Sequence, residues 1–155
     1  MPWRWRLGKN IYRRYSNFTY NKFNLFLGGG GLAETKIERL AEILKKMEMV
    51  GGIHGGAIVA RNGLMMVSNL PKDIDERRFC AMTATMMGAV ETAVATLKRG
   101  AIKRVTAEVE RATVIAMGAG PKAILVVSAE QNANLGILML EMEESADMIR
   151  KIIEE

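Results

Sequence analysis

The residues that could carry out chemistry are few and poorly placed for it. Cys80 is the only cysteine and His54 the only histidine, so the sequence offers neither a thiolate cluster nor a histidine pair for a metal. A serine nucleophile needs a histidine base that a third group orients, and Ser68, Ser128 and Ser145 would all depend on the one histidine. We therefore expect a non-enzyme with no metal and no cofactor. His54 is interpreted as a loop residue, and Cys80 as a small apolar side chain on a helix.

Other candidate motifs also have ordinary structural interpretations. The glycine-rich runs 51–56 and 118–122 match neither GxxxxGK[ST] nor GxGxxG followed by a helix, so we interpret both as turns. The acidic residues Glu141, Glu143 and Glu144 are interpreted as a solvated helix face. These patterns direct attention away from catalysis and toward binding.

The charge of the chain is concentrated at its start. The net charge is +5, but residues 1–31 hold six of the 22 basic residues and none of the 17 acidic ones, which leaves 16 bases against 17 acids, a net −1, in residues 32–155. Eight of the nine aromatic residues also lie in residues 1–31. We therefore expect two segments: a basic, aromatic extension over 1–31 and one domain over 32–155. The nearly neutral domain argues against a nucleic-acid partner.

Residues 1–31 allow three interpretations. Asn, Lys, Ile, Tyr and Phe, which AT-rich codons encode, account for 13 of these residues, and the glycine run 28–31 could be a translated ribosome-binding site; the native start would then lie near Leu32. Alternatively, the segment is a genuine disordered arm, or an arm that lies on anionic lipid or nucleic acid. Membrane contact is expected only if this segment is genuine. The sequence has no apolar stretch of about 20 residues and no disulfide framework, which favours a cytoplasmic protein.

The hydrophobic pattern of the domain predicts eight elements. Thr35 and Glu38 form a capping box before a first helix, Asn62-Gly63 predicts a hairpin turn, and Asn134 caps the last helix. The predicted helices cover 33–49, from Asp73 or Asp75 to Leu97, and 135–153; the predicted strands cover 57–61, 64–68, 102–108, 112–117 and 123–128. The order α-β-β-α-β-β-β-α predicts an α/β protein of the α+β type, a three-layer sandwich in which a five-stranded antiparallel sheet has helices on both faces.

The second helix is the most informative element because it almost lacks charge. Only Glu91 is charged between Phe79 and Leu97, whereas a surface helix of that length should carry several charges. Its large residues Phe79, Met86, Val90 and Leu97 share one face, which suits packing on the sheet. A stripe of small residues lies nearly opposite, at Ala81, Thr85, Gly88, Thr92 and Ala95. Small side chains let two helices approach closely, so we predict a dimer or partner face here; an Ala/Thr-rich surface is the alternative.

These features together resemble the Roadblock family, which includes the roadblock-type dynein light chains, the Ragulator scaffold subunits and prokaryotic regulators of Ras-like GTPases. The resemblance covers about residues 33–154. It rests on the order of elements, the hairpin GGAIVARNGLMMVS and the ending AILVVSAEQNANLGILMLEME. Its most specific positions are turn signatures of the fold: Gly55, Gly56, Asn62, Gly63, Asn134 and Gly136.

The resemblance implies a homodimer in which the second helices pack together and the third strands pair into one ten-stranded sheet. The implied interface adds the strand residues Ile102, Arg104, Thr106 and Glu108 to the small-residue stripe. It also implies a non-catalytic regulator or scaffold that binds a small Ras-like GTPase and modulates its GTP hydrolysis. The alternative is a structural adaptor of a larger assembly with no effect on nucleotide turnover. Arg77, Arg78 and Arg104 could act like arginine fingers, although ordinary surface charge is the simpler interpretation.

Overall fold

The computed structural model describes residues 34–155. The interpretations of residues 1–31, and the domain start expected at residue 32, lie outside the described residues. The order of elements is α-β-β-α-β-β-β-α, with one five-stranded antiparallel sheet, as the sequence predicts.

Helix α3 (Lys36–Glu48) begins at the predicted capping box. The Thr35 hydroxyl accepts from the backbone N–H of Glu38, and the Glu38 carboxylate accepts from the backbone N–H of Thr35. Leu40, Leu44 and Met47 are buried, as the apolar stripe requires. Lys46 pairs with Glu141 on the last helix, with 3.4 Å between Lys46 Nζ and Glu141 Oε1.

The predicted hairpin is present as β1 (Ile53–Ala60) and β2 (Met65–Ser68), with Gly63 in the turn at a φ of +89° that favours glycine. The strand starts earlier than predicted, so His54, Gly55 and Gly56 lie within β1 and not in a turn. Glycine is needed there for space. A Cβ on Gly56 would lie 2.8 Å from the Val126 carbonyl oxygen, and one on Gly55 would lie 2.7 Å from that of Asn69.

Helix α4 (Glu76–Ala95) is capped by Asp75, whose carboxylate accepts from the backbone N–H of Arg78. Its packing face agrees with the predicted one only in part, since Phe79 and Met86 pack against the core but are not its most buried residues. Cys80, Thr83 and Met87 are buried, whereas Phe79, Met86 and Val90 are only half-buried and Leu97 is 62% exposed. The sheet therefore contacts a face rotated from the stripe of largest residues, and a row of large apolar side chains remains partly open.

The last three strands form a meander: β3 (Arg104–Val109), β4 (Ala112–Ala119) and β5 (Ala123–Glu130). Two predicted boundaries are wrong. Ile102 precedes β3 in the loop, and Gly118 lies in β4 and not in the turn. Helix α5 (Leu135–Glu154) begins at Asn134, whose side-chain oxygen accepts from the backbone N–H of Ile137, with Gly136 in its first turn.

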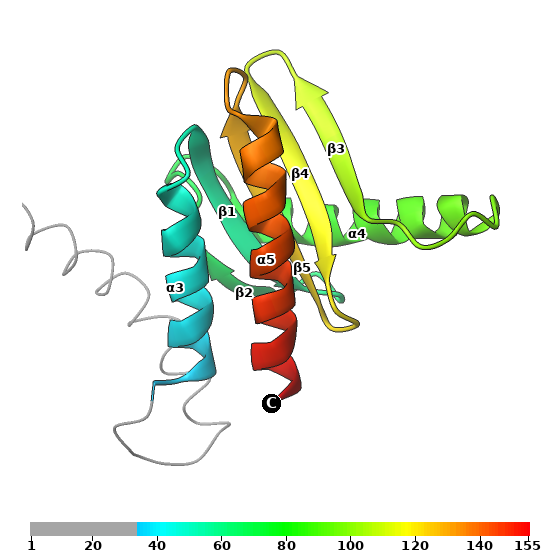
Figure 1. The fold of residues 1–155 in the computed structure, drawn as a ribbon, viewed down its shortest axis with the longest axis horizontal. Helices are drawn as coiled ribbons and strands as arrows, with labels where there is room; N and C mark the ends of the chain where they lie inside the picture. The colour runs from blue at the N-terminus through cyan, green and yellow to red at the C-terminus, as the bar shows by residue number, and fades with distance from the viewer. Residues whose placement is uncertain (1–33) are drawn as a thin grey trace, which may run out of the picture. The chain divides into compact units, whose positions relative to one another are not determined.

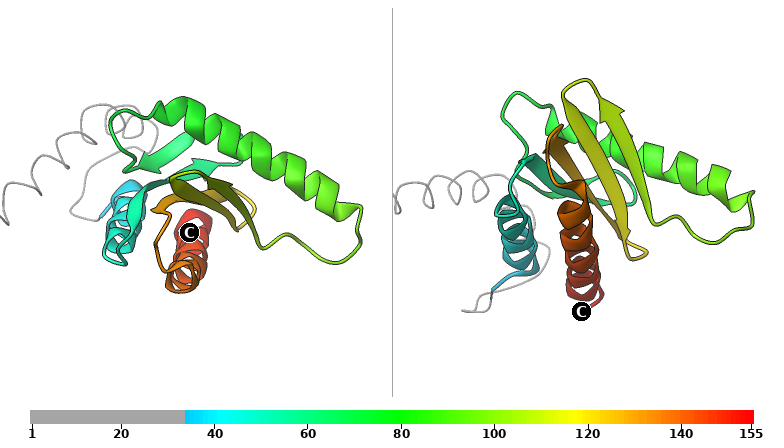
Figure 2. Two further views of the ribbon diagram at one scale, coloured as in Figure 1. Left: turned by 90° about the horizontal axis from the view of Figure 1, so that it is seen from above. Right: turned by 45° about the horizontal axis from the view of Figure 1, so that its top comes forward.

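The elements form three layers, with α4 on one face of the sheet and α3 and α5 on the other (Figures 1 and 2). The strand order β2-β1-β5-β4-β3 places β3 at an edge. On the α4 side, Met87 and Cys80 pack on Ala57, Val59 and Val126. Helix α4 contacts mainly β1 and β2 and runs outward past β3 (Figure 1).

Met87 is central to the packing of α4, so its truncation tests the burial pattern. The side chain is 0% exposed, and we expect Met87→Ala to lower the free energy of unfolding by about 2–5 kcal/mol. Met82, on the same helix and 53% exposed, provides the control: Met82→Ala should change stability by less than about 0.5 kcal/mol. Urea denaturation measures both, and equal losses would contradict the packing described.

Candidate functional site

Helix α4 presents three faces. The buried face holds Cys80, Thr83 and Met87. We call the predicted small-residue stripe the seam face; all its members are exposed, namely Ala81, Thr85, Gly88, Thr92 and Ala95. Beside it lies a stripe that we call the outer face, also exposed, made of Met82, Ala89, Ala93 and Thr96. The part of α4 that faces solvent is thus uncharged along most of its length, which is unusual for a helix surface.

The hydroxyl groups of the seam face are satisfied within the helix. The Thr85 hydroxyl donates to the Ala81 carbonyl oxygen at 3.0 Å, and the Thr92 hydroxyl to that of Gly88 at 2.9 Å. Each hydroxyl is hydrogen-bonded to its own helix. Burial of the seam face therefore leaves no hydroxyl without a hydrogen-bond partner. Gly88 lies at the middle of the stripe, and a Cβ built there meets nothing within 4 Å. A second helix can therefore approach closely.

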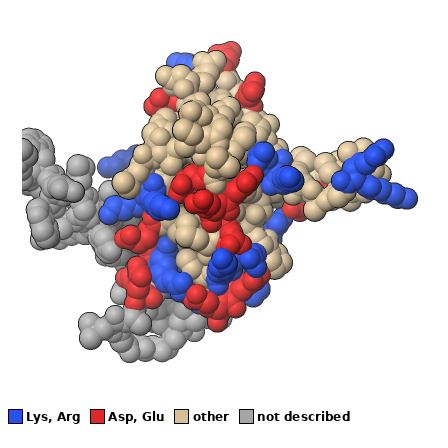
Figure 3. Space-filling view, viewed as in Figure 1, with Lys and Arg blue, Asp and Glu red and all other residues tan. Residues whose placement is uncertain are grey.

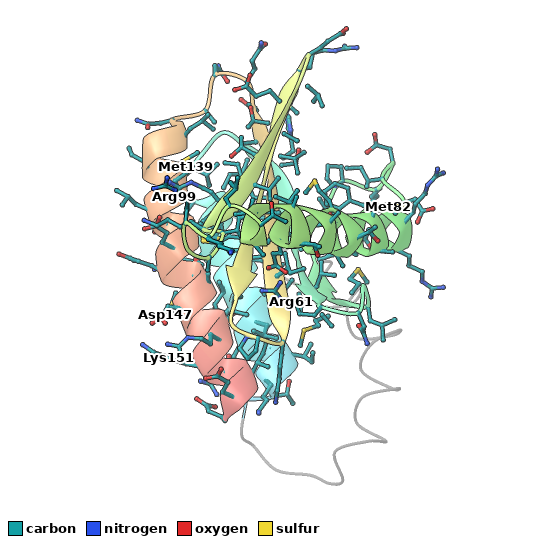
Figure 4. All side chains as sticks on the ribbon, turned by 90° about the vertical axis from the view of Figure 1, so that its right-hand side faces the viewer. Arg61, Met82, Arg99, Met139, Asp147 and Lys151 are labelled. Atoms are coloured by element: carbon teal, nitrogen blue, oxygen red, sulfur yellow. The ribbon has the colours of Figure 1, made fainter. Side chains whose placement is uncertain are left out.

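The one charge in the middle of α4 is neutralised within the fold. Glu91 accepts from Arg61 Nη1 at 2.5 Å, and Arg61 Nη2 donates to the Gly120 carbonyl oxygen at 3.2 Å. Arg61 follows β1, so this contact connects the hairpin and the β4–β5 turn to the C-terminal half of α4 (Figure 4). A hollow of about 420 Å³ lies beside the pair, between the end of α4 and Gly118.

Strand β3 has one unpaired edge in the described part of the chain, since it pairs with β4 alone. Val105 packs toward the α4 side, while Arg104 lies on the opposite face and binds Glu143 of α5 at 2.9 Å. Thr106 and Glu108 are exposed. The free edge lies on the side of the molecule on which α4 extends past the sheet (Figure 1).

The residues considered for catalysis do not form a site. His54 Nδ1 and Ser128 Oγ are 3.4 Å apart, but no acidic group hydrogen-bonds to this histidine within residues 34–155. Burial raises the pKa of the Cys80 thiol to about 11, so at neutral pH it is protonated and a poor nucleophile. Ser145 is buried in α5. In the described region, no group of three or more His, Cys, Asp or Glu side chains could hold a metal ion.

The acidic run on α5 is solvated at Glu143 and Glu144, which are exposed as predicted, whereas Glu141 is half-buried. Glu141 contacts Lys46, and Glu143 binds Arg104. Farther along, Asp147 accepts from Lys151 and Arg150, and these bonds lower the pKa of Asp147 to about 2. None of the helices in residues 34–155 is long and apolar enough to span a membrane.

Comparison with known proteins agrees with this fold. Residues 39–129 match the family model of the Roadblock/LC7 domain. The chain belongs to the Roadblock/LC7 family. It is 31% identical over 108 residues to the uncharacterized protein MJ0310 of Methanocaldococcus jannaschii, which covers 70% of this chain and 94% of that protein. A second protein of that organism, MJ1340, is 30% identical over the same share of both chains.

Several solved structures have the same fold as the domain. A structure described as MglB with tetrameric arrangement has a TM-score of 0.73 at 21% identity, covering 79% of this chain and 93% of that chain. The gliding protein MglB of Thermus thermophilus has a TM-score of 0.72 at 20% identity, covering 79% and 94%. A Roadblock/LC7 domain from Streptomyces avermitilis has a TM-score of 0.69 at 15% identity, covering 74% and 98%. These likenesses establish the fold alone.

Sequence reasoning missed two structural features that position α4. Met87 was assigned to no face, although it is the buried centre of α4. The Arg61–Glu91 pair also went unnoticed, although a lone acidic residue in an uncharged helix is a signal that a basic partner lies nearby. The roles predicted for the seam face, and for Ile102, Arg104, Thr106 and Glu108, remain predictions.

The Arg61–Glu91 pair should stabilise the packing of the C-terminal half of α4. Both side chains are about one-third exposed, so we expect Glu91→Gln to lower the free energy of unfolding by at most about 1 kcal/mol. The loss should shrink in about 1 M salt, which screens partly exposed pairs. Exposed Glu42 provides the control, and Glu42→Gln should have no measurable effect in urea denaturation. A loss that does not depend on salt would contradict an ionic role.

Proposed function

We propose that this Roadblock protein is a homodimeric, non-catalytic regulator that binds a small Ras-like GTPase through α4. The observation that carries the proposal is the helix itself: two uncharged exposed faces next to a free sheet edge. The proposal assigns the seam face to a second copy of the chain and the outer face to the GTPase.

A second copy is a suitable partner for the seam face because the stripe is symmetric about Gly88. Ala81 and Ala95 each lie seven residues from Gly88, and Thr85 and Thr92 lie three and four residues away. Two antiparallel helices that cross at Gly88 therefore place small side chains opposite small side chains, as an isologous contact requires. The same two-fold axis would pair β3 with its counterpart and so protect both edges.

The outer face remains open in such a dimer and is the proposed GTPase site. Members of the Roadblock family include prokaryotic regulators of Ras-like GTPases, which supports the assignment. With no catalytic constellation in residues 34–155, this chain would act by binding and reshaping the GTPase's own site. Arg104 is engaged with Glu143, which leaves Arg78 better placed than Arg104 to approach a partner on α4. We also propose a cytoplasmic protein, for which the free thiol of Cys80 is suited.

The dimer is tested by placing one charge on each face of α4. Gly88→Glu puts a carboxylate at the crossing point, and we expect it to shift the protein to monomer in sedimentation velocity. Glu is a better helix former than Gly and has open space at this position, so the fold should persist. Ala93→Glu, on the outer face, is the control and should leave the dimer intact. A Gly88→Glu protein that remains dimeric would place the interface elsewhere.

The GTPase assignment is tested by capture and turnover. The immobilised chain should retain a Ras-like GTPase, and GTP hydrolysis by that GTPase should change when the chain is added. Ala93→Glu should abolish capture while preserving the dimer. Capture with an unchanged hydrolysis rate would favour the alternative function, a structural adaptor. If no GTPase is retained, the assignment of the outer face is wrong.

A further inference from the structure

The C-terminal half of α4, residues 88–95, has little packing within the described part of the chain. The α4 side chains that are in the core, or that pack against it, lie between Phe79 and Met87. Within residues 88–95 three side chains are half-buried and the others are exposed. In Figure 3 the end of α4 projects from the body of the domain, with basic atoms at its tip. This half therefore lacks the burial that stabilises most helices in folded proteins.

A hollow lies between this half and β4. Its volume is about 420 Å³, and it is lined by Val94 and Ala95 on the helix and by Gly118 on β4. The ion pair of Glu91 with Arg61 lies beside it. Both side chains of that pair are about one-third exposed, and such a pair contributes little to stability. Contacts with the sheet of the same chain are thus too few to hold this half firmly.

The sequence of this half also favours a helix only weakly. Gly88 loses more conformational freedom in a helix than any other residue would, and Val90, Thr92 and Val94 are β-branched residues of low helix propensity. Just past the helix, Lys98 has a φ of +53°, a conformation that favours glycine. The last turns of α4 therefore depend on contacts that a single copy of the domain does not provide.

The proposed dimer would supply those contacts. In an antiparallel crossing at Gly88, the C-terminal half of α4 in one copy lies along the N-terminal half of α4 in the other, so that Ala95 is opposite Ala81. The N-terminal half is held on its own sheet by Cys80 and Met87. Each copy would place its weakly packed half against the firmly packed half of the other, as a two-fold axis requires.

We propose that residues 88–95 are stably helical only when a second copy covers them, so that dimer formation completes the outer face of α4. Two of the four outer-face residues, Ala89 and Ala93, lie in this half, and Thr96 follows it directly. This inference rests on the proposed function, since it concerns the regulation of the site assigned there to a partner. A partner bound to the outer face then strengthens the dimer by the same factor by which the dimer strengthens partner binding.

The test measures amide hydrogen exchange in the full chain by mass spectrometry, above and below the concentration at which half of the protein is dimeric. Sedimentation velocity on the same samples gives the fraction of dimer. We expect the amides of residues 89–95 to exchange at least about tenfold faster in the monomer, because local unfolding exposes them. Peptides from β5 and α5 are the internal references, and their exchange should change by less than about twofold.

Two matched variants separate the effect of the second copy from the effect of a new charge on the helix. Gly88→Glu, on the seam face, should show the fast exchange of the monomer at every concentration, although Glu favours a helix more than Gly does. Ala93→Glu, on the outer face, should exchange as slowly as the wild-type dimer.

Three results would contradict the inference. If residues 89–95 exchange equally slowly in monomer and dimer, the helix does not need the second copy, although the proposed dimer still stands. If β5 and α5 lose protection together with residues 89–95, the monomer unfolds as a whole and this half is not a separate unit. If no dimer forms at any concentration, both the inference and the proposed dimer are wrong.

Discussion

The lack of charge along α4 is the constraint on which the rest of the structure depends. A solvent-exposed helix normally has a charged side, whereas here the single charge in its middle is neutralised by Arg61 from the hairpin. That ion pair neutralises Glu91 and connects the C-terminal half of the helix to the hairpin. This uncharged surface is the basis on which we propose protein contact through α4.

The features around α4 support the same conclusion. The seam threonines bond back to their own helix, Gly88 leaves room for a close crossing, and β3 is left with a free edge. Each is ordinary alone, but together they satisfy the backbone and side-chain requirements of a two-fold interface. The absence of a catalytic cluster in residues 34–155 fits a protein that works by assembly.

The sequence predicts the fold well because its signals are local. The Thr35–Glu38 capping box, the Asn62-Gly63 turn and the Asn134 cap depend on residues a few positions apart, and all are present. The predicted face of α4 was right only in part: Phe79 and Met86 pack against the core, but side-chain size does not decide which stripe is fully buried. Met87 is buried, while the larger Phe79 is only half-buried. The sequence also misplaced Gly55 and Gly56, which lie in a strand. Glycine is required there because the backbone of the distant Asn69 and Val126 leaves no room for a Cβ, and no local pattern reveals this.

The most direct test of the account is oxidative cross-linking between copies of the chain. A Gly88→Cys protein should form a covalent dimer readily under mild oxidation, because a two-fold crossing at this residue brings the two thiols within disulfide range. Cys80 is buried and should not interfere. Ala93→Cys, on the outer face, should stay monomeric on a denaturing gel. If Gly88→Cys does not cross-link, or cross-links no faster than Ala93→Cys, the second copy does not bind the seam face.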